Sequence, residues 1–444
     1  MKPPYSKKTF NMKHSLICIV LLLFNTLRAQ DTLTYQKCVE IALENNWGIL
    51  IARDNQSIAA NNAKAGNASL HPKVSLNAGL NGSLNNVTQQ FVTESDKNSI
   101  KAARSTSENA SIDVNYNLYQ GKTRINNLKN FRIQSTMSEL ETKNTIEETM
   151  VLIGQAYYEV AGQQANSDLL DDVLKVSNER FKRTEYKYQY GDAVKIDVLN
   201  AEVNLNSDSI RYMTAQRSLS QAKKRLTVLM GQEPNENFGV SIKVEFMNDL
   251  DRETLKNELT TNNTILKLSD AQITKAQYDL AIARGNRTPI LGARVGYGIN
   301  ASQSDAGVLK TNLANGLNAG LTLTWDIYDG NKKNIQIQNA NIQKHITEKK
   351  KEDQKLTLSR DLENSWSEYT YQLSVIRLQK RNIETNKLNF ERSEEMYDFG
   401  QLTSTQFREA QVNYLQARYD YIVSNASAKV EELKLLRYSG RLVQ

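Results

Sequence analysis

The chain has 444 residues, of which 39% are hydrophobic and only five are proline. Its mean hydropathy is −0.56, yet its apolar residues recur with regular periods, which excludes a disordered chain. The formal net charge is +7, but five of the 56 basic residues and none of the 49 acidic residues lie in residues 1–30. The remainder has a net charge of +2, so we expect no nucleic-acid partner.

Residues 1–30 have the pattern of a secretory signal peptide. A lysine-rich start precedes an apolar run at residues 16–24, which is shorter than a membrane-spanning helix. Cleavage after Ala29 or Gln30 would leave Cys38 as the one cysteine of the mature chain, so we expect no internal disulfide.

Beyond this segment the sequence contains two copies of one unit. Glycines recur at an offset of 209 residues, which pairs Gly121 with Gly330, Gly191 with Gly400 and Gly231 with Gly440. Upstream, an Asn-Asn pair and a proline recur at an offset of 217 residues, at 45–46 and Pro72 and again at 262–263 and Pro289. Chance matches do not keep register over so many landmarks, so we interpret the chain as a duplication. The predicted domains are a signal peptide (1–30), a first repeat (31–231), a linker (232–249) and a second repeat (250–444).

Each repeat contains two segments in which apolar and polar residues alternate. They predict strands at 73–84 and 110–119 in the first repeat and at 290–299 and 317–328 in the second. Alternation with period two gives a strand one apolar face and one polar face. About ten residues is also the length that a tilted strand needs to cross a bilayer.

Features around these strands favour a membrane position over the alternative, two hairpins half-buried on a soluble core. Polar stretches at 85–109 and 300–316 join the strands as external loops would. Aromatic residues cluster where the strands approach the helices, as at a membrane interface: Tyr116, Tyr119, Trp325 and Tyr328. Four strands cannot close a barrel, so a membrane role requires an oligomer.

Very long helices are predicted after the strands. Residues 122–187 contain no proline, and a helix of this length reaches about 99 Å. The wide polar surface of this segment suits the wall of a tube better than a compact core. Further helices are predicted at 33–70, 194–230 and 331–398. A narrow apolar seam with coiled-coil spacing marks the first long helix, formed by Ile146, Met150, Ile153, Tyr157 and Val160.

In their order and spacing, these segments resemble the TolC-like outer membrane efflux protein family. The resemblance includes the opening LTYQKCVEIALENN (33–46), a proline before the first strand of each repeat and an aromatic-x-Gly motif after the second strand. It also includes two turns, YQYGDAVKIDVLNA (188–201) and YDFGQLTSTQFREA (397–410). It spans nearly all of the mature chain.

The resemblance implies a mainly α-helical fold with transmembrane β-strands. Three identical chains would each give four strands to a twelve-stranded outer-membrane barrel, surrounded by outer-membrane lipid, above a periplasmic helical tunnel. The implied function is a passive exit duct for small-molecule efflux, docked onto a periplasmic adaptor (membrane fusion protein) and an inner-membrane pump. Two alternatives remain open: an exit duct for type I protein secretion, and a structural envelope protein without a channel.

The resemblance places the functional residues at the two turns. The hairpin tips, expected to contact the adaptor, contain Gly191, Asp192, Gly400, Gln401 and Leu402. The expected constriction of the pore contains Tyr397, Gln406, Glu409 and Asp197. The glycines are also explained as simple helix stops, and Glu409 as an ordinary solvated residue.

Two departures from the family pattern affect this site. Gln406 occupies the first of two acidic positions, so a trimer would carry three constriction carboxylates, all from Glu409. Asp197 matches a latch acid that pairs with Tyr397, but Leu402 stands in place of the latch arginine. We therefore expect a closed state that is weaker or is held by apolar contacts.

No motif indicates catalysis. The mature chain has two histidines, His71 and His345, and neither belongs to a metal-ligand pattern. Walker, Rossmann and G-x-S-x-G fingerprints are absent. We therefore expect neither an enzyme nor a cofactor or metal site.

Overall fold

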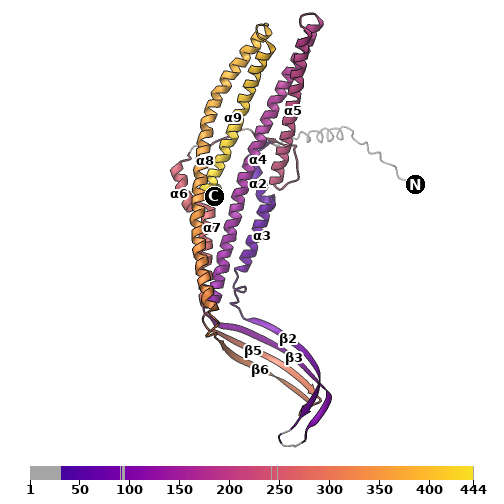
Figure 1. The fold of residues 1–444 in the computed structure, drawn as a ribbon, viewed down its shortest axis with the longest axis vertical. Helices are drawn as coiled ribbons and strands as arrows, with labels where there is room; N and C mark the ends of the chain where they lie inside the picture. Colours follow the sequence, from indigo (N-terminus) through magenta and orange to yellow (C-terminus); the bar gives the residue numbers. More distant parts are fainter. Residues whose placement is uncertain (1–31, 91, 93–95, 242, 248, 444) are drawn as a thin grey trace, which may run out of the picture. The chain divides into compact units, whose positions relative to one another are not determined.

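The computed structural model describes residues 32–443 apart from 91, 93–95, 242 and 248 (Figure 1). The predicted signal peptide lies outside the described residues. The chain divides into two compact units, and both repeats contribute to each. The sheet unit comprises Ile51–Asn144 and Asn262–Leu358. The helical unit comprises the described part of Met1–Leu50, Thr145–Thr261 and Ser359–Gln444.

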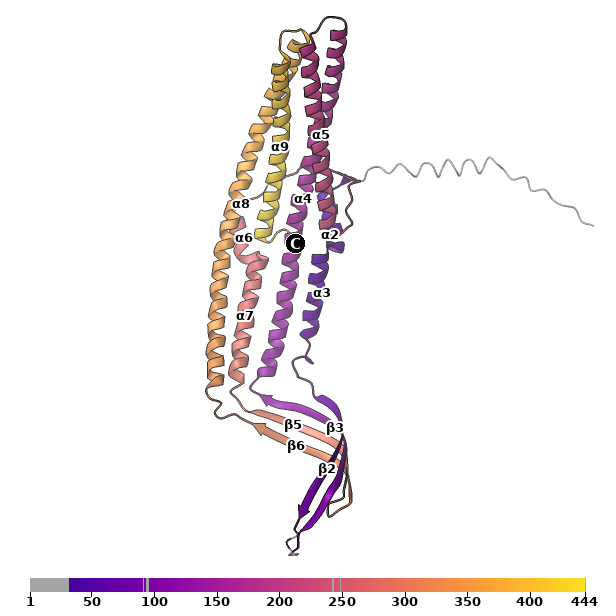
Figure 2. The same ribbon diagram turned by 45° about the vertical axis from the view of Figure 1, so that its right-hand side comes forward.

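The sheet unit contains antiparallel strands in the order β2–β3–β5–β6 (Figure 2). They are β2 (Lys73–Gln89), β3 (Asn98–Gln120), β5 (Ile290–Ser304) and β6 (Thr311–Thr324). Strands β3 and β5 come from different repeats and pair along the sheet centre. The sheet therefore joins the two repeats and has β2 and β6 as its edges.

These strands cover most of the stretches 85–109 and 300–316, so the prediction of long loops there was wrong. The prediction followed apolar alternation, whereas backbone hydrogen bonds continue where both faces of a hairpin are polar. Strand β6 also begins and ends earlier than predicted, stopping at Thr324 instead of residue 328.

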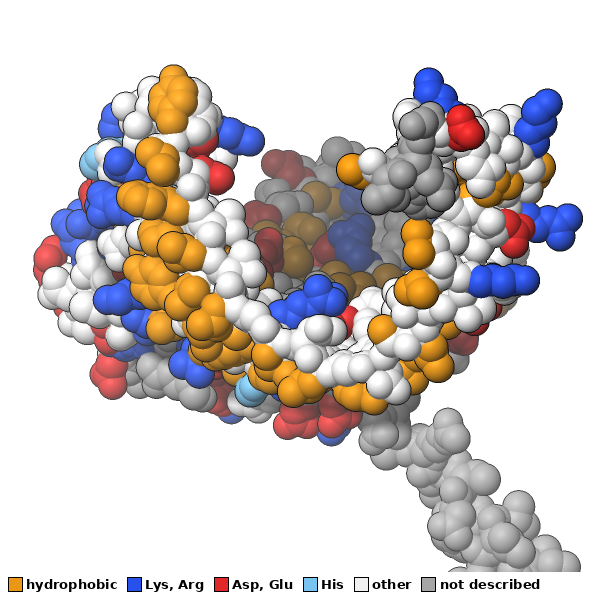
Figure 3. Space-filling model, turned by 90° about the horizontal axis from the view of Figure 1, so that it is seen from below, with side chains coloured by type: hydrophobic (Ala, Val, Ile, Leu, Met, Phe, Trp, Pro, Cys, Tyr) orange, Lys and Arg blue, Asp and Glu red, His pale blue; other side chains and the backbone are white. Residues whose placement is uncertain are grey.

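One face of the sheet is apolar. The register places side chains of all the strands in common rows, for example Leu76, Ile112, Tyr297 and Leu317, and all of this row is exposed. Figure 3 shows a continuous band of hydrophobic side chains along the curved surface. The sheet therefore exposes a continuous apolar surface on one face.

The opposite face of the sheet carries a polar network around Asp113. This buried carboxylate accepts hydrogen bonds from Arg294 Nη2 at 2.9 Å and from Arg294 Nε at 3.1 Å. Its second oxygen accepts from Asn77 Nδ2 at 2.8 Å and from Ser111 Oγ at 2.9 Å. The network ties β2, β3 and β5 together on the polar side.

The helix predicted at 33–70 is two helices, α2 (Tyr35–Asn45) and α3 (Trp47–Asn62), so the prediction of a single helix was wrong. The break lies at Asn46, whose backbone is extended and whose side chain accepts a hydrogen bond from the Ile49 N–H at 3.1 Å. The second repeat has the same break, where Asn263 caps α7 (Thr264–Gly285) directly after α6 (Arg252–Asn262).

Three of the long helices lie close to their predicted positions, and the fourth, α9, completes the second hairpin. They are α4 (Thr123–Gln189), α5 (Lys195–Leu229), α8 (Lys332–Asp398) and α9 (Ser404–Ser439). Each is followed by a glycine with positive φ, at the repeated positions 191, 231, 400 and 440. None of the helices in the described ranges combines the length and the apolar character of a membrane-spanning helix.

A hydrophobic core in the helical unit joins α2, the middle of α4 and the end of α5. Beside it, β1 (Thr32–Leu33) pairs in parallel with β4 (Gly239–Val240), which belongs to the linker. The buried Tyr157 hydroxyl lies 3.1 Å from the carbonyl oxygens of both Leu33 and Ser241. The predicted linker is therefore anchored to the core of the first repeat.

Candidate functional site

The two hairpin tips share one backbone geometry. Gly191 and Gly400 have φ values of +82° and +70°, a left-handed conformation that strains any residue with a Cβ atom. In each tip the next residue, Asp192 or Gln401, donates its N–H at 2.8 Å to a carbonyl oxygen of the last helical turn. These Schellman bonds end α4 and α8, and both glycines act as helix stops.

Two residues predicted at the constriction cap the return helices. Asp197 and Gln406 occupy equivalent positions of the repeats, 209 residues apart. The Asp197 carboxylate accepts a hydrogen bond from the Val194 N–H at 3.3 Å, and Gln406 Oε1 accepts one from the Thr403 N–H at 3.1 Å. The Thr403 hydroxyl accepts in return from the Gln406 N–H at 3.4 Å, which completes a capping box.

Tyr397 packs between the hairpins. Its ring stacks on the buried ring of Phe407, with centroids 5.3 Å apart. The Arg180 guanidinium lies 4.6 Å from the centroid of Tyr397 and 4.2 Å from that of Phe407. Among the described residues no hydrogen bond joins Tyr397 to Asp197: the Asp197 carboxylate accepts from the Val194 N–H, and the Tyr397 ring stacks on Phe407.

The other predicted tip residues lie at the surface. Glu409, in the second turn of α9, is exposed, and Leu402 is half-buried. Large aromatic rings are exposed beside both turns, with Tyr190 82% and Phe399 80% accessible. Exposed rings of this size are typical of surfaces that bind another protein.

A buried ion pair, absent from the sequence predictions, joins α5 to α9. The side chains of Asp208 and Arg408 are only 1% and 15% exposed. Arg408 Nη1 donates to Asp208 at 2.7 Å, and Arg408 Nη2 contacts the other carboxylate oxygen. Ser177 donates to the same carboxylate at 2.5 Å, and Gln411 accepts from Arg408 at 3.0 Å. This bidentate pair fastens the second hairpin to the first.

The duplication contains a signal for this pair. The positions equivalent to Asp208 and Arg408 in the other repeat are Ala417 and Leu199. Each repeat thus replaces an apolar residue by a charge, and the two charges have opposite signs. Such complementary departures from a repeat indicate a contact between its halves.

A second ion pair joins the two hairpins near their tips. Arg183 Nη1 lies 2.7 Å from an Asp398 carboxylate oxygen, and both side chains are largely exposed. Arg183 is eight residues before Gly191, whereas Asp398 is two residues before Gly400. Beyond this pair the first hairpin therefore has six more residues before its turn glycine than the second.

The aromatic residues predicted at a membrane interface lie in the sheet unit, where strands meet helices. The Tyr116 hydroxyl accepts a hydrogen bond from Arg124 Nη2 at 3.0 Å. Trp325 Nε1 donates at 3.2 Å to a backbone carbonyl between α7 and β5. Tyr119 and Tyr328 are exposed.

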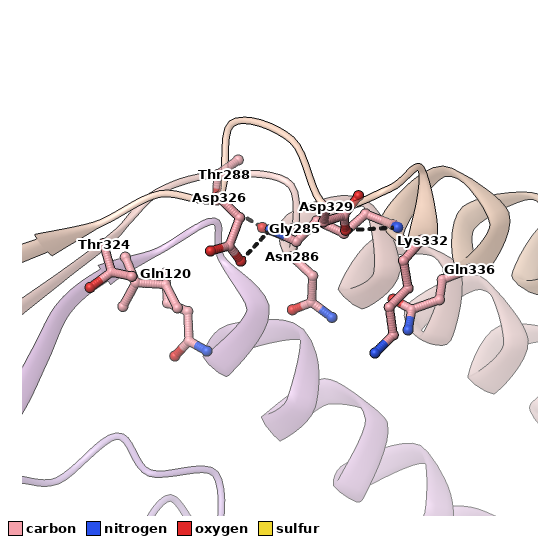
Figure 4. Close-up of a pocket in the computed structure, with 11 residues that line it drawn as sticks. Gln120, Gly285, Asn286, Thr288, Thr324, Asp326, Asp329, Lys332 and Gln336 are labelled. Carbon is pink, nitrogen blue, oxygen red and sulfur yellow. Dashed lines mark hydrogen bonds and ion pairs between the residues drawn. The ribbon is translucent and has the colours of Figure 1, made fainter.

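A polar cleft of about 410 Å³ opens at the same end of the sheet (Figure 4). Within it, Lys333 Nζ donates to Asp326 at 3.0 Å, and the Lys333 N–H donates to Asp329 at 3.0 Å. In the described part of the chain, no group of three or more His, Cys, Asp or Glu residues is placed to hold a metal ion.

Comparison with protein families and curated proteins gives a consistent result. The family model described as outer membrane efflux protein matches residues 38–232 and 255–441. The chain is 22% identical over 327 residues to the toluene efflux pump outer membrane protein TtgC of Pseudomonas putida, over 71% of this chain and 66% of that protein. It is 21% identical over 398 residues to the outer membrane protein TolC of Vibrio cholerae, over 86% of each chain.

Solved structures share the fold. The CmeC outer membrane channel of Campylobacter jejuni has a TM-score of 0.79 at 17% identity, over 92% of this chain and 86% of that chain. The open state of the MtrE outer membrane channel of Neisseria gonorrhoeae has a TM-score of 0.71 at 16% identity, over 92% and 89%. The family model matches both repeats, and the protein therefore belongs to the outer membrane efflux protein family.

Proposed function

We propose that this outer-membrane protein is the passive exit duct of a tripartite pump that exports small molecules. Three copies each give four strands to a twelve-stranded barrel, and their hairpins form a tunnel through the periplasm. A periplasmic adaptor and an inner-membrane pump supply the substrate and the energy. The observation that carries this proposal is the exposed apolar face of the sheet.

The physical argument starts from this face. Leucine, isoleucine, valine and tyrosine side chains of adjacent strands form a continuous exposed surface, whereas monomeric soluble proteins rarely expose large apolar patches. Hydrocarbon removes the cost of this exposure. The other face, with Asp113 and Arg294, suits contact with water. Backbone groups at the sheet edges must be paired in lipid, which requires further strands from other copies.

The similar proteins favour small-molecule efflux over protein secretion. TtgC belongs to a toluene efflux pump, and ArpC of Pseudomonas putida, equally 22% identical, belongs to an antibiotic efflux pump. Export of apolar or amphiphilic compounds is therefore the first proposal for this chain. Type I protein secretion is the alternative within the same architecture.

The hairpin tips are the proposed contact with the adaptor. The exposed rings of Tyr190 and Phe399 beside Gly191 and Gly400 offer apolar area at low entropic cost. Just inside the tips, three copies of Glu409 form the proposed ring of carboxylates at the constriction. Tyr397, Asp197 and Gln406 position the helices there through the contacts described for them.

The experiment that tests the duct is conductance of the purified protein in a planar bilayer, with the oligomer mass measured on the same sample. A trimer with discrete conductance steps supports the proposal. A monomer, or an oligomer without conductance, contradicts it.

Neutralising Glu409 should weaken cation preference. Carboxylates in a narrow pore concentrate cations through the local field. We therefore expect Glu409→Gln to reduce the ratio of potassium to chloride permeability by about twofold, read from the reversal potential in a salt gradient. The matched control is Glu202→Gln, which removes one exposed carboxylate from the first hairpin at a similar distance from its tip. Equal shifts in both variants would mean that Glu409 has no special position in the pore.

A further inference from the structure

Through the duplication, the two edge strands of the sheet are equivalent to the two strands that pair at its centre. At the sheet centre, β3 of the first repeat pairs with β5 of the second. At the edges lie β6, the equivalent of β3, and β2, the equivalent of β5, and neither has an outer partner among the described residues. A junction of the same kind can therefore form only between copies, with β6 of one beside β2 of the next.

We propose that the register between copies repeats the register within the chain, so that Leu321 of one copy lies opposite Leu80 of the next. Within the chain, Ile112 of β3 lies opposite Tyr297 of β5. Adding the repeat offset of 209 to residue 112 gives residue 321, and subtracting 217 from residue 297 gives residue 80. The inference rests on the oligomer of the proposed function and specifies its contacts residue by residue.

This register continues the apolar face across the junction. The same transfer places Leu323 opposite Ala78 and Leu317 opposite Leu84 of the next copy. All of these side chains are exposed on the apolar face in the single chain. A slip by one residue would turn the apolar residues of β6 to the polar face, so that register is excluded. The contact joins two different edges, and repeated around an axis it closes a ring.

The segment after β6 gives an independent reason to place a strand there. Strand β3 continues for five residues beyond the position equivalent to Thr324, where β6 ends, and four of these five pair with β5. Beyond this end, Ile327 and Tyr328 are each 85% exposed, whereas the equivalent Leu118 and Tyr119 are 50% and 47% exposed. Strand β5 lies beside Leu118 and Tyr119, whereas no strand among the described residues lies beside Ile327 and Tyr328.

The glycine that follows each of these segments shows the same difference. A Cβ atom on Gly121 would lie 2.1 Å from Thr288 Oγ1 and 2.3 Å from the Gly285 carbonyl oxygen. A Cβ atom on the equivalent Gly330 would meet nothing within 4 Å. The connection before β5 covers Gly121, so the connection before β2 of the next copy is the counterpart that covers Gly330.

The charges of Asp329 and Lys73 agree with the proposed register between copies. The pairing of Gln120 with Ile290 transfers to Asp329 opposite Lys73 of the next copy. Asp329 lines the cleft at the free edge of the sheet (Figure 4). The junction therefore brings opposite charges together where the strands leave the apolar region.

Pairs of cysteines in the full-length protein test the register. Leu321→Cys with Leu80→Cys should give disulfide-linked species up to the trimer after mild oxidation of outer membranes. The matched control, Ile112→Cys with Tyr297→Cys, is the equivalent pair within the chain and should close a disulfide at monomer mass. The native Cys38 does not compete, because burial raises the pKa of its thiol to about 12.

A pair of cysteines displaced along the strands distinguishes the proposed register from other registers. Leu317→Cys with Leu80→Cys lies about 13 Å out of register, beyond disulfide reach, and should link about tenfold less than the predicted pair. Stronger linkage of the displaced pair overturns the register. Absence of linkage in the predicted pair, in a protein that is trimeric and conducting, also overturns the register but leaves the proposed function intact. A monomeric, non-conducting protein overturns both.

Discussion

Replacing Asp208 by alanine should lower the local free energy of unfolding of the paired hairpins by about 3–5 kcal/mol. The substitution leaves the Arg408 guanidinium without its carboxylate in a site where its side chain is only 15% exposed. Hydrogen exchange of α5 and α9 near the pair should then accelerate on the order of a hundredfold or more. In the proposed channel, the same loosening should raise the basal conductance, because the second hairpin is less firmly held.

Two further variants make this result interpretable. The double variant Asp208→Leu with Arg408→Met replaces both charges by apolar groups and should recover most of the stability. Asp398→Ala breaks an ion pair whose side chains are 63% and 47% exposed, and it should cost no more than about 1 kcal/mol. If Asp208→Ala were as mild as Asp398→Ala, the buried pair would not hold the hairpins together.

Replacing Gly231 by alanine should be among the most destabilising substitutions of a single methyl group in this chain. Its φ of +75° costs about 1–2 kcal/mol for a residue with a Cβ atom. The new atom would also lie 2.1 Å from the Asn45 carbonyl oxygen, a backbone atom that cannot turn away. Moving it disturbs the hydrogen bond of 2.8 Å from Asn46 Nδ2 to the Leu229 carbonyl oxygen. We expect a total loss of at least about 3 kcal/mol, measured by thermal or denaturant unfolding.

Gly191→Ala is the matched control for this effect. Gly191 has a similar φ of +82° and ends a helix with the same bonds, but a Cβ atom there would meet nothing within 4 Å. Its alanine variant should therefore show the conformational strain alone, about 1–2 kcal/mol. Equal losses for the two glycines would show that the close approach of Asn45 carries no energetic cost.

Much of the architecture was predictable because it follows from the spacing of the apolar residues and from the internal duplication. Strand starts at 73 and 290 follow directly from alternation after a proline, and the ends of the long helices follow from repeated glycines. Strand ends were not predictable in this way, since the strands remain paired beyond the residues in which apolar and polar side chains alternate. The breaks at Asn46 and Asn263 were visible as repeated asparagines, but their role as caps depends on backbone geometry.

The candidate site was predicted less completely. The turns around Gly191 and Gly400 lie where the sequence placed them, since left-handed helix ends leave a glycine signature. The capping role of Gln406 was readable in the pattern from Thr403 to Gln406, a threonine followed three residues later by glutamine. The pairing of Asp208 with Arg408 spans 200 residues, and its one signal in the sequence is the complementary departure of the two repeats at these positions.

The unequal lengths of the two hairpins beyond the Arg183–Asp398 pair have a consequence for the symmetry of the assembly. Duplication makes the tunnel wall nearly sixfold, yet three chains with unequal hairpins end in a crown of three tall and three short points. A partner with a flat rim would touch only the tall points, formed around Gly191. A partner that seals the passage must therefore have a rim with two alternating heights, even when all of its own subunits are identical.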